Sequence, residues 1–565
     1  MQGIITKISG PTVVAGSMHN SKMYNLVYVG EMKLIGEVIR IDGSNATIQV
    51  YEETTGLSLG DKVIDTGQPL SIELGPGLLT TIFDGVQRPL EEIAASSSSE
   101  GFIPAGVQLP ALNRTKKWHF VPLVHSGDLI EEGDLVGTIQ ETANIIHKVM
   151  CPPGLRGIIT EIIKGELSVE DTAVTFEDGS GINLVQRWPV RKARPFKKKV
   201  ISGTPFITGQ RIIDTLFPVS TGGSVIIPGG FGTGKTVLEQ TLAKFAGTDV
   251  IVYVGCGERG NEIADVLTDF PKLRDPYTGR PLMERTVLVV NTSNMPVAAR
   301  EASIYTGITI GEYYRDMGYN VALLADSISR WAEAMREISG RLEELPGEEG
   351  FPMYLASRLA AFYERGGMVE CLGKDNRMGS ITVCTAISPP GGDFSEPVTQ
   401  SAMRVTGAMW ALDTDLARRR HYPAINWEKS FSLYQLNEWF RDHVADDWIY
   451  LKSELLKILQ REEELQYIIR LLGPDSLRDQ DRVVSEMGRL IRENYLQQSP
   501  YSTGDAYCTL EKQYRMLRTF LNIYKTALKE LEEGVGIAQI FNEERMILLR
   551  DLKNMTEDKI REWTY

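Results

Sequence analysis

The chain has 565 residues, several times the length of a typical domain, and about 150 residues per domain predicts three or four folding units. Its composition, with 42% hydrophobic and 24% charged residues, is ordinary for a globular protein and excludes wholesale disorder. The formal net charge of −14 would repel a nucleic-acid backbone, which disfavours a helicase or another nucleic-acid motor.

Other classes of protein are disfavoured by local patterns. The longest apolar runs, such as 250–255 and 321–325, extend over about five or six residues, whereas a helix across a bilayer needs roughly 20. The first residues alternate like a strand and lack the pattern of a signal peptide, which predicts a cytosolic location. The five cysteines include no C-x-x-C pair and the six histidines show no ligand spacing, so we expect reduced thiols and no transition metal.

In chain order, four regions of different pattern follow one another. Residues 1–93 carry short alternating runs separated by turn residues, which predicts a small antiparallel barrel. Residues 97–191 hold further short strand candidates and predict a second, inserted β-rich region. In residues 195–426 apolar runs alternate with helical stretches, the pattern of βαβ units around a mainly parallel sheet. Residues 427–565 carry Leu, Glu, Arg and Gln at helical spacing, as in 453–465 and 517–531, and predict a helical domain.

A phosphate-binding loop stands at the start of the third region. The string Gly229–Thr236 is a full G-x-x-x-x-G-K-[ST] match, and it follows an apolar strand candidate and precedes a helical stretch. Glycines let backbone N–H groups converge on phosphate oxygens, and the helix that follows directs its positive end at the same anion. We expect Lys235 to neutralise phosphate charge and the Thr236 hydroxyl to bind Mg²⁺. A structural nucleotide site without hydrolysis stays open on the loop alone.

Two acidic strand ends add the remaining chemistry. The run Val321–Asp326 ends in an acid like a Walker B strand, so Asp326 is predicted to hold Mg²⁺, directly or through water. Arg330 is predicted either to reach phosphate or to form a surface ion pair. The strand candidate at 249–256 leads into Glu258 and Arg259, at the edge where a doubly wound sheet binds ligands. We expect Glu258 to activate water and Arg259 to stabilise phosphoryl charge.

Glu262 is the alternative to Glu258 as the catalytic acid, and an ion pair at a helix start is the structural alternative for either residue.

Several strings in order resemble one family. The segments 232–236, 253–262, 325–334, 388–398 and 421–427 together resemble the catalytic A subunit of vacuolar/archaeal (V/A-type) rotary ATPases. The resemblance extends from the N-terminal region to residues near 510–517, and the segment 97–191 is similar to the bulge, or non-homologous region, of that family. It implies a multidomain α/β fold: an N-terminal β-barrel, an inserted β-rich bulge domain, a central P-loop (RecA-like) nucleotide-binding domain and a C-terminal helical domain.

The resemblance also implies site residues and cofactors. It implies that ATP or ADP binds with Mg²⁺ and that Tyr422 stacks on the adenine, although a core tyrosine before a proline turn is an even alternative. Gln497 and Gln498 are weaker candidates for the adenine rim. The nucleotide-binding set is Gly229, Gly230, Phe231, Gly232, Thr233, Gly234, Lys235, Thr236, Val237, Arg330, Tyr422, Gln497 and Gln498.

The partners are implied by the resemblance alone. Three such chains would alternate with three B subunits in an A3B3 ring, with an arginine finger supplied in trans by the B subunit. Central rotor stalk and peripheral stalk subunits would link the ring to a membrane sector that moves H⁺ or Na⁺, which places the chain at the cytosolic face of a membrane. Thr233 stands where eukaryotic members carry Cys, and this favours a bacterial or archaeal complex.

Two alternative functions remain at this stage. One is a non-catalytic nucleotide-binding ring subunit, against which the complete P-loop and Glu258 argue. The other is a different hexameric ring ATPase, such as a secretion or RNA motor, against which the acidic charge and the inserted β-rich region argue. The expected activity is ATP hydrolysis or synthesis coupled to ion transport.

Overall fold

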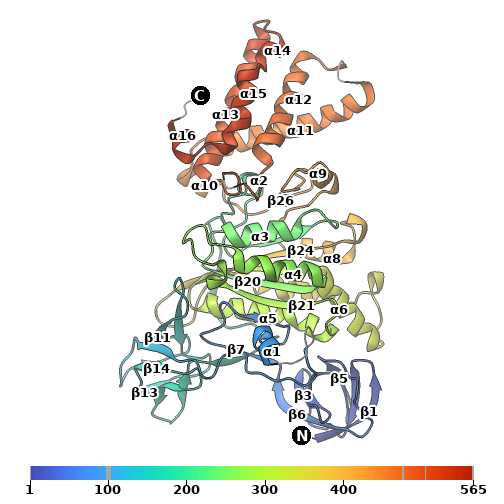
Figure 1. Cartoon of the computed structure of the whole chain (residues 1–565), viewed down its shortest axis with the longest axis vertical. Helices are drawn as coiled ribbons and strands as arrows, with labels where there is room; N and C mark the ends of the chain where they lie inside the picture. Colours follow the sequence, from blue (N-terminus) through green and yellow to red (C-terminus); the bar gives the residue numbers. More distant parts are fainter. Residues whose placement is uncertain (1, 97–102, 474–475, 503, 563–565) are drawn as a thin grey trace. The chain divides into compact units, whose positions relative to one another are not determined.

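The structure, a computed structural model, describes residues 2–96, 103–473, 476–502 and 504–562. The chain divides into two compact units, each assembled from segments that are distant in the sequence. The first unit comprises Met1–Ile201, Thr248–Ile387 and Ser395–Val405, and the second comprises Ser202–Gly247, Ser388–Phe394 and Thr406–Tyr565. Figure 1 labels the helices and strands of both units.

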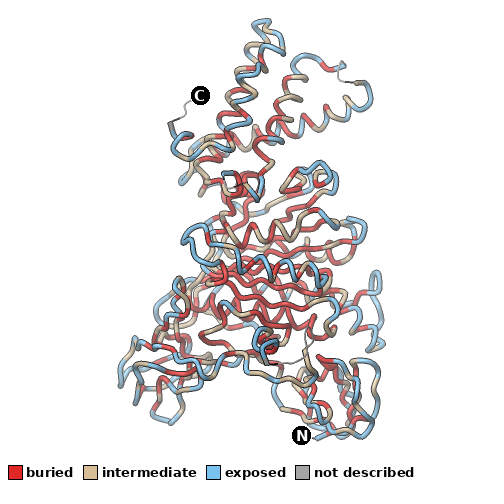
Figure 2. Tube along the Cα trace, viewed as in Figure 1, coloured by how far each residue is buried: buried red, intermediate tan, exposed pale blue. Residues whose placement is uncertain are grey.

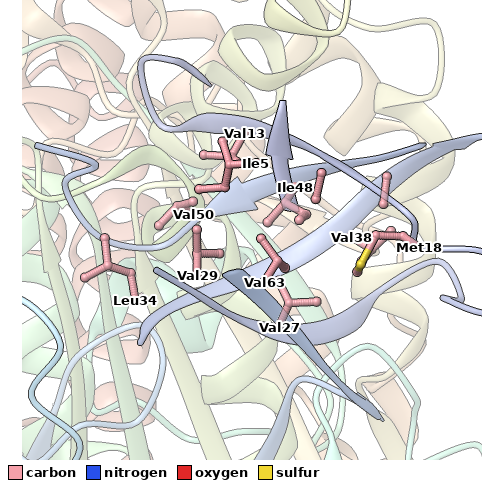
Figure 3. Close-up of a cluster of buried hydrophobic side chains, with 12 residues drawn as sticks. Ile5, Val13, Met18, Val27, Val29, Leu34, Val38, Ile48, Val50 and Val63 are labelled. Carbon is pink, nitrogen blue, oxygen red and sulfur yellow. The ribbon is translucent and has the colours of Figure 1, made fainter. Parts of the chain in front are cut away.

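An antiparallel barrel begins the first unit. Apolar and polar residues alternate along its strands, so one side of each strand faces a common interior. Hydrogen bonds close the barrel in the order β1-β2-β5-β4-β3-β6. Figure 3 shows aliphatic side chains such as Ile5, Val29 and Val63 gathered inside it. The predicted N-terminal β-barrel is therefore confirmed. Its strands are β1 (Gln2–Ser9), β2 (Thr12–Gly16), β3 (Asn25–Val29), β4 (Leu34–Asp42), β5 (Asn45–Val50) and β6 (Lys62–Pro69).

Two four-stranded antiparallel sheets form the β-rich insertion of the same unit, in the orders β10-β13-β15-β16 and β12-β11-β9-β14. A two-stranded ribbon of β7 (Ser71–Leu74) and β17 (Gln186–Pro189) pairs the chain before the insertion with the insertion's last residues. The predicted boundary at residue 97 lies outside the described residues. The insertion's strands are β9 (Trp118–Pro122), β10 (Leu129–Ile130), β11 (Leu135–Gln140), β12 (Ile146–Met150), β13 (Gly157–Ile162), β14 (Gly165–Leu167), β15 (Thr172–Phe176) and β16 (Gly181–Asn183).

A parallel sheet in the order β24-β22-β20-β21-β8 completes the first unit. Every residue of β20 is buried, as expected for a strand covered on both faces, and Figure 2 shows this sheet as buried. An antiparallel extension runs from β24 through β23 to β18. The strands are β8 (Ile82–Phe83), β18 (Lys198–Val200), β20 (Val250–Glu258), β21 (Thr286–Thr292), β22 (Asn320–Asp326), β23 (Gly367–Glu370) and β24 (Met378–Ile387).

Several helices of the first unit pack on this sheet, and α5 is buried along its whole length because it lies against β20, β21, β22 and β24. The helices are α1 (Leu90–Ser96), α4 (Gly260–Asp269), α5 (Val297–Asp316), α6 (Ile328–Arg341), α7 (Leu355–Glu364) and α8 (Pro397–Met403), with short 3₁₀ turns η1 (Phe270–Lys272), η2 (Leu282–Arg285) and η3 (Glu348–Gly350).

The second unit begins with a short sheet and its helices. The strand β19 (Ser224–Pro228) pairs in parallel with β25 (Ala408–Met409), which pairs antiparallel with β26 (Phe431–Ser432). Helix α3 (Lys235–Phe245) follows β19 after a six-residue loop. The other short helices here are α2 (Arg211–Leu216), α9 (Thr414–Arg418) and the 3₁₀ turn η4 (Pro390–Gly392).

Helices make up the rest of the second unit. The predicted helical stretches 453–465 and 517–531 lie within α11 and α13, so the C-terminal helical domain is confirmed. Within the described ranges, no helix combines the length and apolarity needed to span a bilayer. The helices are α10 (Asn437–His443), α11 (Trp448–Leu472), α12 (Asp479–Ile491), the π-helix η6 (Arg492–Leu496), α13 (Leu510–Glu532), α14 (Ile537–Ile540), α15 (Glu543–Asp551), the 3₁₀ turn η7 (Leu552–Asn554) and α16 (Glu557–Glu562).

Candidate functional site

The phosphate-loop sequence lies between β19 and α3, in the order that the motif requires. Two of its glycines adopt left-handed backbone conformations, Gly232 at φ +76° and Gly234 at φ +88°. Side-chain-bearing residues rarely take these angles, so glycine is needed at both positions. Gly234 is also the N-cap of α3, and its carbonyl accepts from Leu238 N at 2.9 Å. The N–H groups of the first helical turn, which have no carbonyl four residues earlier within the helix, are thereby directed toward the loop.

Side chains of the loop stabilise its curvature. Lys235 Nζ donates to the carbonyl oxygens of Gly229 at 2.7 Å and Gly230 at 3.0 Å, and Thr233 Oγ1 also donates to Gly230 O at 2.8 Å. Thr233 is buried, Phe231 is 78% exposed, and Thr236 is half-buried in the first turn of α3. An ammonium, a hydroxyl and backbone N–H groups at a helix start are the donors and ligands that a triphosphate with Mg²⁺ needs.

An apolar pocket lies beside the loop in the second unit. Helix α3 contributes Val237 and Leu238 to it, and other segments contribute Leu412, Tyr422, Pro423 and Pro500. The Tyr422 ring lies close to Gly234, because a Cβ on that glycine would stand 3.3 Å from the Tyr422 Cε1 atom. A mainly apolar pocket beside a phosphate loop has the character expected for a nucleotide base.

The two glutamines predicted at the base rim differ in position. Gln498 lines the pocket, but its side-chain amide is bonded inward: Oε1 accepts from Arg211 N at 2.9 Å and Nε2 donates to Gly209 O at 2.8 Å. Gln497 is half-buried, and its Nε2 donates to Arg420 O at 3.1 Å. Gln498 therefore shapes the pocket wall, while the Gln497 side chain is directed to a neighbouring carbonyl.

In the first unit, two carboxylates end adjacent parallel strands. Glu258 is the last residue of β20 and Asp326 the last residue of β22, and the register pairs Gly255 with Asp326. Glu258 is 7% exposed and Asp326 is 3% exposed. Ser327, directly after β22, donates from Oγ to Glu258 Oε1 at 2.8 Å. Parallel strands bring the predicted pair of acids to one edge of the sheet, as the sequence indicates.

The environment of Glu258 favours its protonated form. Burial is the largest cause, followed by the negative charge of Asp326, and together they raise the pKa of Glu258 from 4.5 to about 7. The hydrogen bond from Ser327 and the positive charge of Arg330 oppose this change. A carboxyl group that titrates near pH 7 is able both to accept and to release a proton under ordinary conditions.

The other charged residues at this edge are less buried. Arg259 is exposed and occupies the N-cap position of α4, and Glu262 is half-exposed in the first turn of that helix. Arg330, in the first turn of α6, donates from Nη1 to both oxygens of Glu333 at 2.9 Å. The ion pair predicted as the alternative for Arg330 is therefore present, although its charge still acts on Glu258.

Arg300, in the first turn of α5, is a neighbour that the sequence reasoning missed. A Cβ on Gly257, whose φ is +70°, would stand 2.6 Å from Arg300 Cδ. Arg300 Nη2 donates to Ser293 O at 2.8 Å, while its Nε is buried without a hydrogen-bond partner among the described residues. The sequence did offer a signal for Arg300: it comes early in the helix that follows a strand. Residues at such positions lie at the ligand edge of an α/β sheet.

The models of four protein domains match consecutive parts of the chain. The nucleotide-binding domain of the ATP synthase alpha/beta family matches residues 209–432, and that family's beta-barrel domain matches residues 5–67. The barrel-sandwich domain of ATP synthase alpha/beta subunits matches residues 109–191, and the C-terminal domain of V and A type ATP synthase matches residues 437–541.

Similar proteins extend over nearly the whole chain. The A-type ATP synthase A subunit 2 of Methanospirillum hungatei is 55% identical over 96% of this chain and 92% of its own length. The A-type ATP synthase A subunit of Methanopyrus kandleri is 57% identical over the same shares, and the V-type ATP synthase alpha chain of Thermoanaerobacter pseudethanolicus is 56% identical over 95% and 92%. The chain belongs to this family of A-type ATP synthase A subunits and V-type ATP synthase alpha chains.

Membership confirms the resemblance and the fold class predicted from the sequence. The assembled ATPase EscN of the enteropathogenic E. coli type III secretion system shares the fold of this A-type/V-type subunit, with a TM-score of 0.64 over 92% of this chain and 99% of that one. Its sequence identity is 22%, so this likeness concerns the fold alone.

Proposed function

We propose that this A-type/V-type subunit is the catalytic subunit of a V/A-type rotary ATPase, which hydrolyses or synthesises ATP. The buried Glu258 supports this most directly, because it lies at the ligand edge of the sheet and titrates near neutral pH. A subunit that only held nucleotide would have no need of such a group.

Phosphate binding is assigned to the loop before α3. Lys235 would exchange its carbonyl partners for the β- and γ-phosphate oxygens, and the backbone N–H groups after Gly234 would bind the same oxygens. Thr236 and Asp326 are proposed to hold Mg²⁺, since both offer the oxygen ligands that it prefers. When bound, this ion neutralises phosphate charge.

Glu258 is assigned the proton transfer. As a carboxylate it would accept a proton from the water that attacks the γ-phosphate, with Ser327 holding Oε1 and leaving Oε2 for the water. Arg259 and Arg300 are proposed to stabilise charge on the transferred phosphoryl group. The unpaired Nε of Arg300 supports that role, because a buried donor without a partner is costly unless a ligand accepts from it.

The base is assigned to the pocket beside α3, with Tyr422 as the stacking residue. Contact between a base and an aromatic ring contributes about 1 to 3 kcal/mol, so Tyr422 would supply a substantial part of nucleotide affinity. The half-buried ring and the apolar side chains around it support this assignment.

The assembly is proposed from the relatives. This subunit would alternate with B subunits in an A3B3 ring, receive an arginine finger from the B subunit, and act through central and peripheral stalk subunits on a membrane sector that moves H⁺ or Na⁺. It would lie at the cytosolic face of the membrane without entering it.

Steady-state ATP hydrolysis tests the proposal, measured for the chain alone and after mixing with the B subunit of the same organism. We expect strong activity only in the mixture, and its loss in Glu258→Gln. Glu262→Gln is the matched control, because it removes a neighbouring carboxylate on α4 and we expect it to retain activity. Full activity of the Glu258→Gln mixture would contradict the assignment.

A further inference from the structure

The wall of the base pocket depends on a segment without regular structure. Between η6 and α13 the described residues 497–502 and 504–509 form neither helix nor strand, yet Gln498 and Pro500 line the pocket. A segment of this kind is held by bonds from outside it, because it has no internal hydrogen-bond ladder. The residues that bond to this segment from outside therefore fix the position of the pocket wall.

Arg211, the first residue of α2, supplies three of them, beside bonds such as that from Gln210 Nε2 to Ala506 O at 2.9 Å. Its side chain is fully buried, and its guanidinium donates from Nε to Tyr495 O at 2.5 Å and from Nη2 to Gln497 O at 2.7 Å. It donates from Nη1 to Asp505 Oδ1 at 2.7 Å. One planar group thus joins both ends of the segment, using three of its nitrogen atoms at once.

Three further hydrogen bonds connect these residues to the pocket. Asp505 Oδ2 accepts from Ser499 N at 2.9 Å, and Gln498 Oε1 accepts from the backbone N of Arg211 at 2.9 Å. Gln498 N in turn donates to Tyr422 O at 2.8 Å. Gln497 O, which accepts from the guanidinium, and Gln498 N belong to one peptide unit, so the guanidinium holds the peptide that donates to Tyr422 O.

We infer that Arg211 is a positioning residue for nucleotide-base recognition: its guanidinium fixes residues 497–502 and 504–506 and, through the peptide unit between Gln497 and Gln498, the backbone of Tyr422. The inference rests on the function proposed above. Lysine would keep the charge opposite Asp505, but a single ammonium cannot reproduce the fork that reaches two carbonyls and a carboxylate in one plane.

The same geometry separates the base from the phosphates. The hydrogen bonds that shape the phosphate loop come from Lys235 and Thr233 within the loop, whereas the Arg211 bonds given above all go to other segments. Loosening of residues 497–502 and 504–506 should therefore weaken recognition of a base and leave recognition of a bare phosphate chain nearly unchanged.

Calorimetric titration of the full chain with Mg²⁺ and either ATP or inorganic tripolyphosphate tests this. Tripolyphosphate carries the phosphate chain without a base. We expect wild type to prefer ATP. We expect Arg211→Lys to bind ATP about tenfold more weakly, the size of a partly lost base contact, and to bind tripolyphosphate within about twofold of wild type.

Two variants keep the test decisive. Asp505→Asn removes the charge opposite Arg211 at constant size. It should weaken the binding of ATP but not of tripolyphosphate, by a smaller factor than Arg211→Lys does. Arg545→Lys is the matched control, because Arg545 in α15 makes a similar paired contact with Glu530 in α13, at 2.6 Å. This substitution should leave the binding of both ligands unchanged.

Equal weakening of ATP and tripolyphosphate, or no weakening in Arg211→Lys and Asp505→Asn, would overturn the inference. A wild-type chain that binds neither ligand would instead overturn the proposed function, and the inference with it.

Discussion

Substitution of Glu258 by Gln should change how the stability of the first unit depends on pH. In the folded chain the pKa of Glu258 is about 7, against an ordinary 4.5. Folding therefore favours the protonated carboxyl, so its stabilising contribution is complete below about pH 4.5 and is lost as the pH rises through 7. Each pKa unit is worth about 1.4 kcal/mol, so the wild-type chain should lose about 3 kcal/mol across that window.

A glutamine side chain at this position cannot ionise, so the variant lacks this loss: Glu258→Gln should be more stable than wild type at pH 8, with a clearly smaller advantage at pH 5. Urea unfolding monitored at both pH values measures the difference, and Glu262→Gln, which alters a half-exposed carboxylate, serves as the control. A variant whose stability relative to wild type is the same at pH 5 and pH 8 would refute the reasoning. Such a result would mean that burial does not disfavour the ionised form of Glu258.

Three other substitutions have defined outcomes. Lys235→Ala should weaken ATP binding by about 10- to 100-fold in calorimetry, because it removes a charged hydrogen bond to phosphate. Gly257→Ala should destabilise the chain by about 1 to 3 kcal/mol in urea unfolding, since the new Cβ is strained at φ +70° and overlaps Arg300, whereas Gly260→Ala has open space and should be nearly neutral. Tyr422→Ala should lose about 1 to 3 kcal/mol of ATP binding by the same titration, and Tyr422→Phe should retain it.

Local patterns explain the parts that the sequence predicted well. The order of β19, loop and α3 follows from glycines that the tight turn requires, and the barrel follows from alternation with a period of two. The strand end at Asp326 was predictable because an apolar run that stops at an acid marks the edge of a buried strand. Glu258 was predicted to follow a strand over 249–256, whereas β20 continues through Glu258 itself. The family was recognised because ordered motifs extend along most of the chain.

Contacts between residues distant in the chain could not be predicted from the sequence. The bond from Ser327 to Glu258 joins residues 69 positions apart, and the Arg211 bonds to residues 495–505 join positions nearly 300 apart. No periodicity encodes such pairs, because tertiary packing alone brings them together. The inward bonding of Gln498 is of the same kind. The domain boundaries and the roles of the site residues stay predictions, which the substitutions above address.

The closed N-terminal barrel has a consequence during synthesis. A ribosome adds about 5 to 20 residues per second, so the roughly 500 residues after Pro69 take about 25 to 100 s to make. All six strands of the barrel lie within residues 2–69, so its ring of strand pairs needs no strand from the later segments. Because β1 pairs with both β2 and β6, the ring of hydrogen bonds has no open strand edge to recruit another nascent chain. Ring closure thus leaves no strand of the barrel waiting for a partner from a segment that is made later.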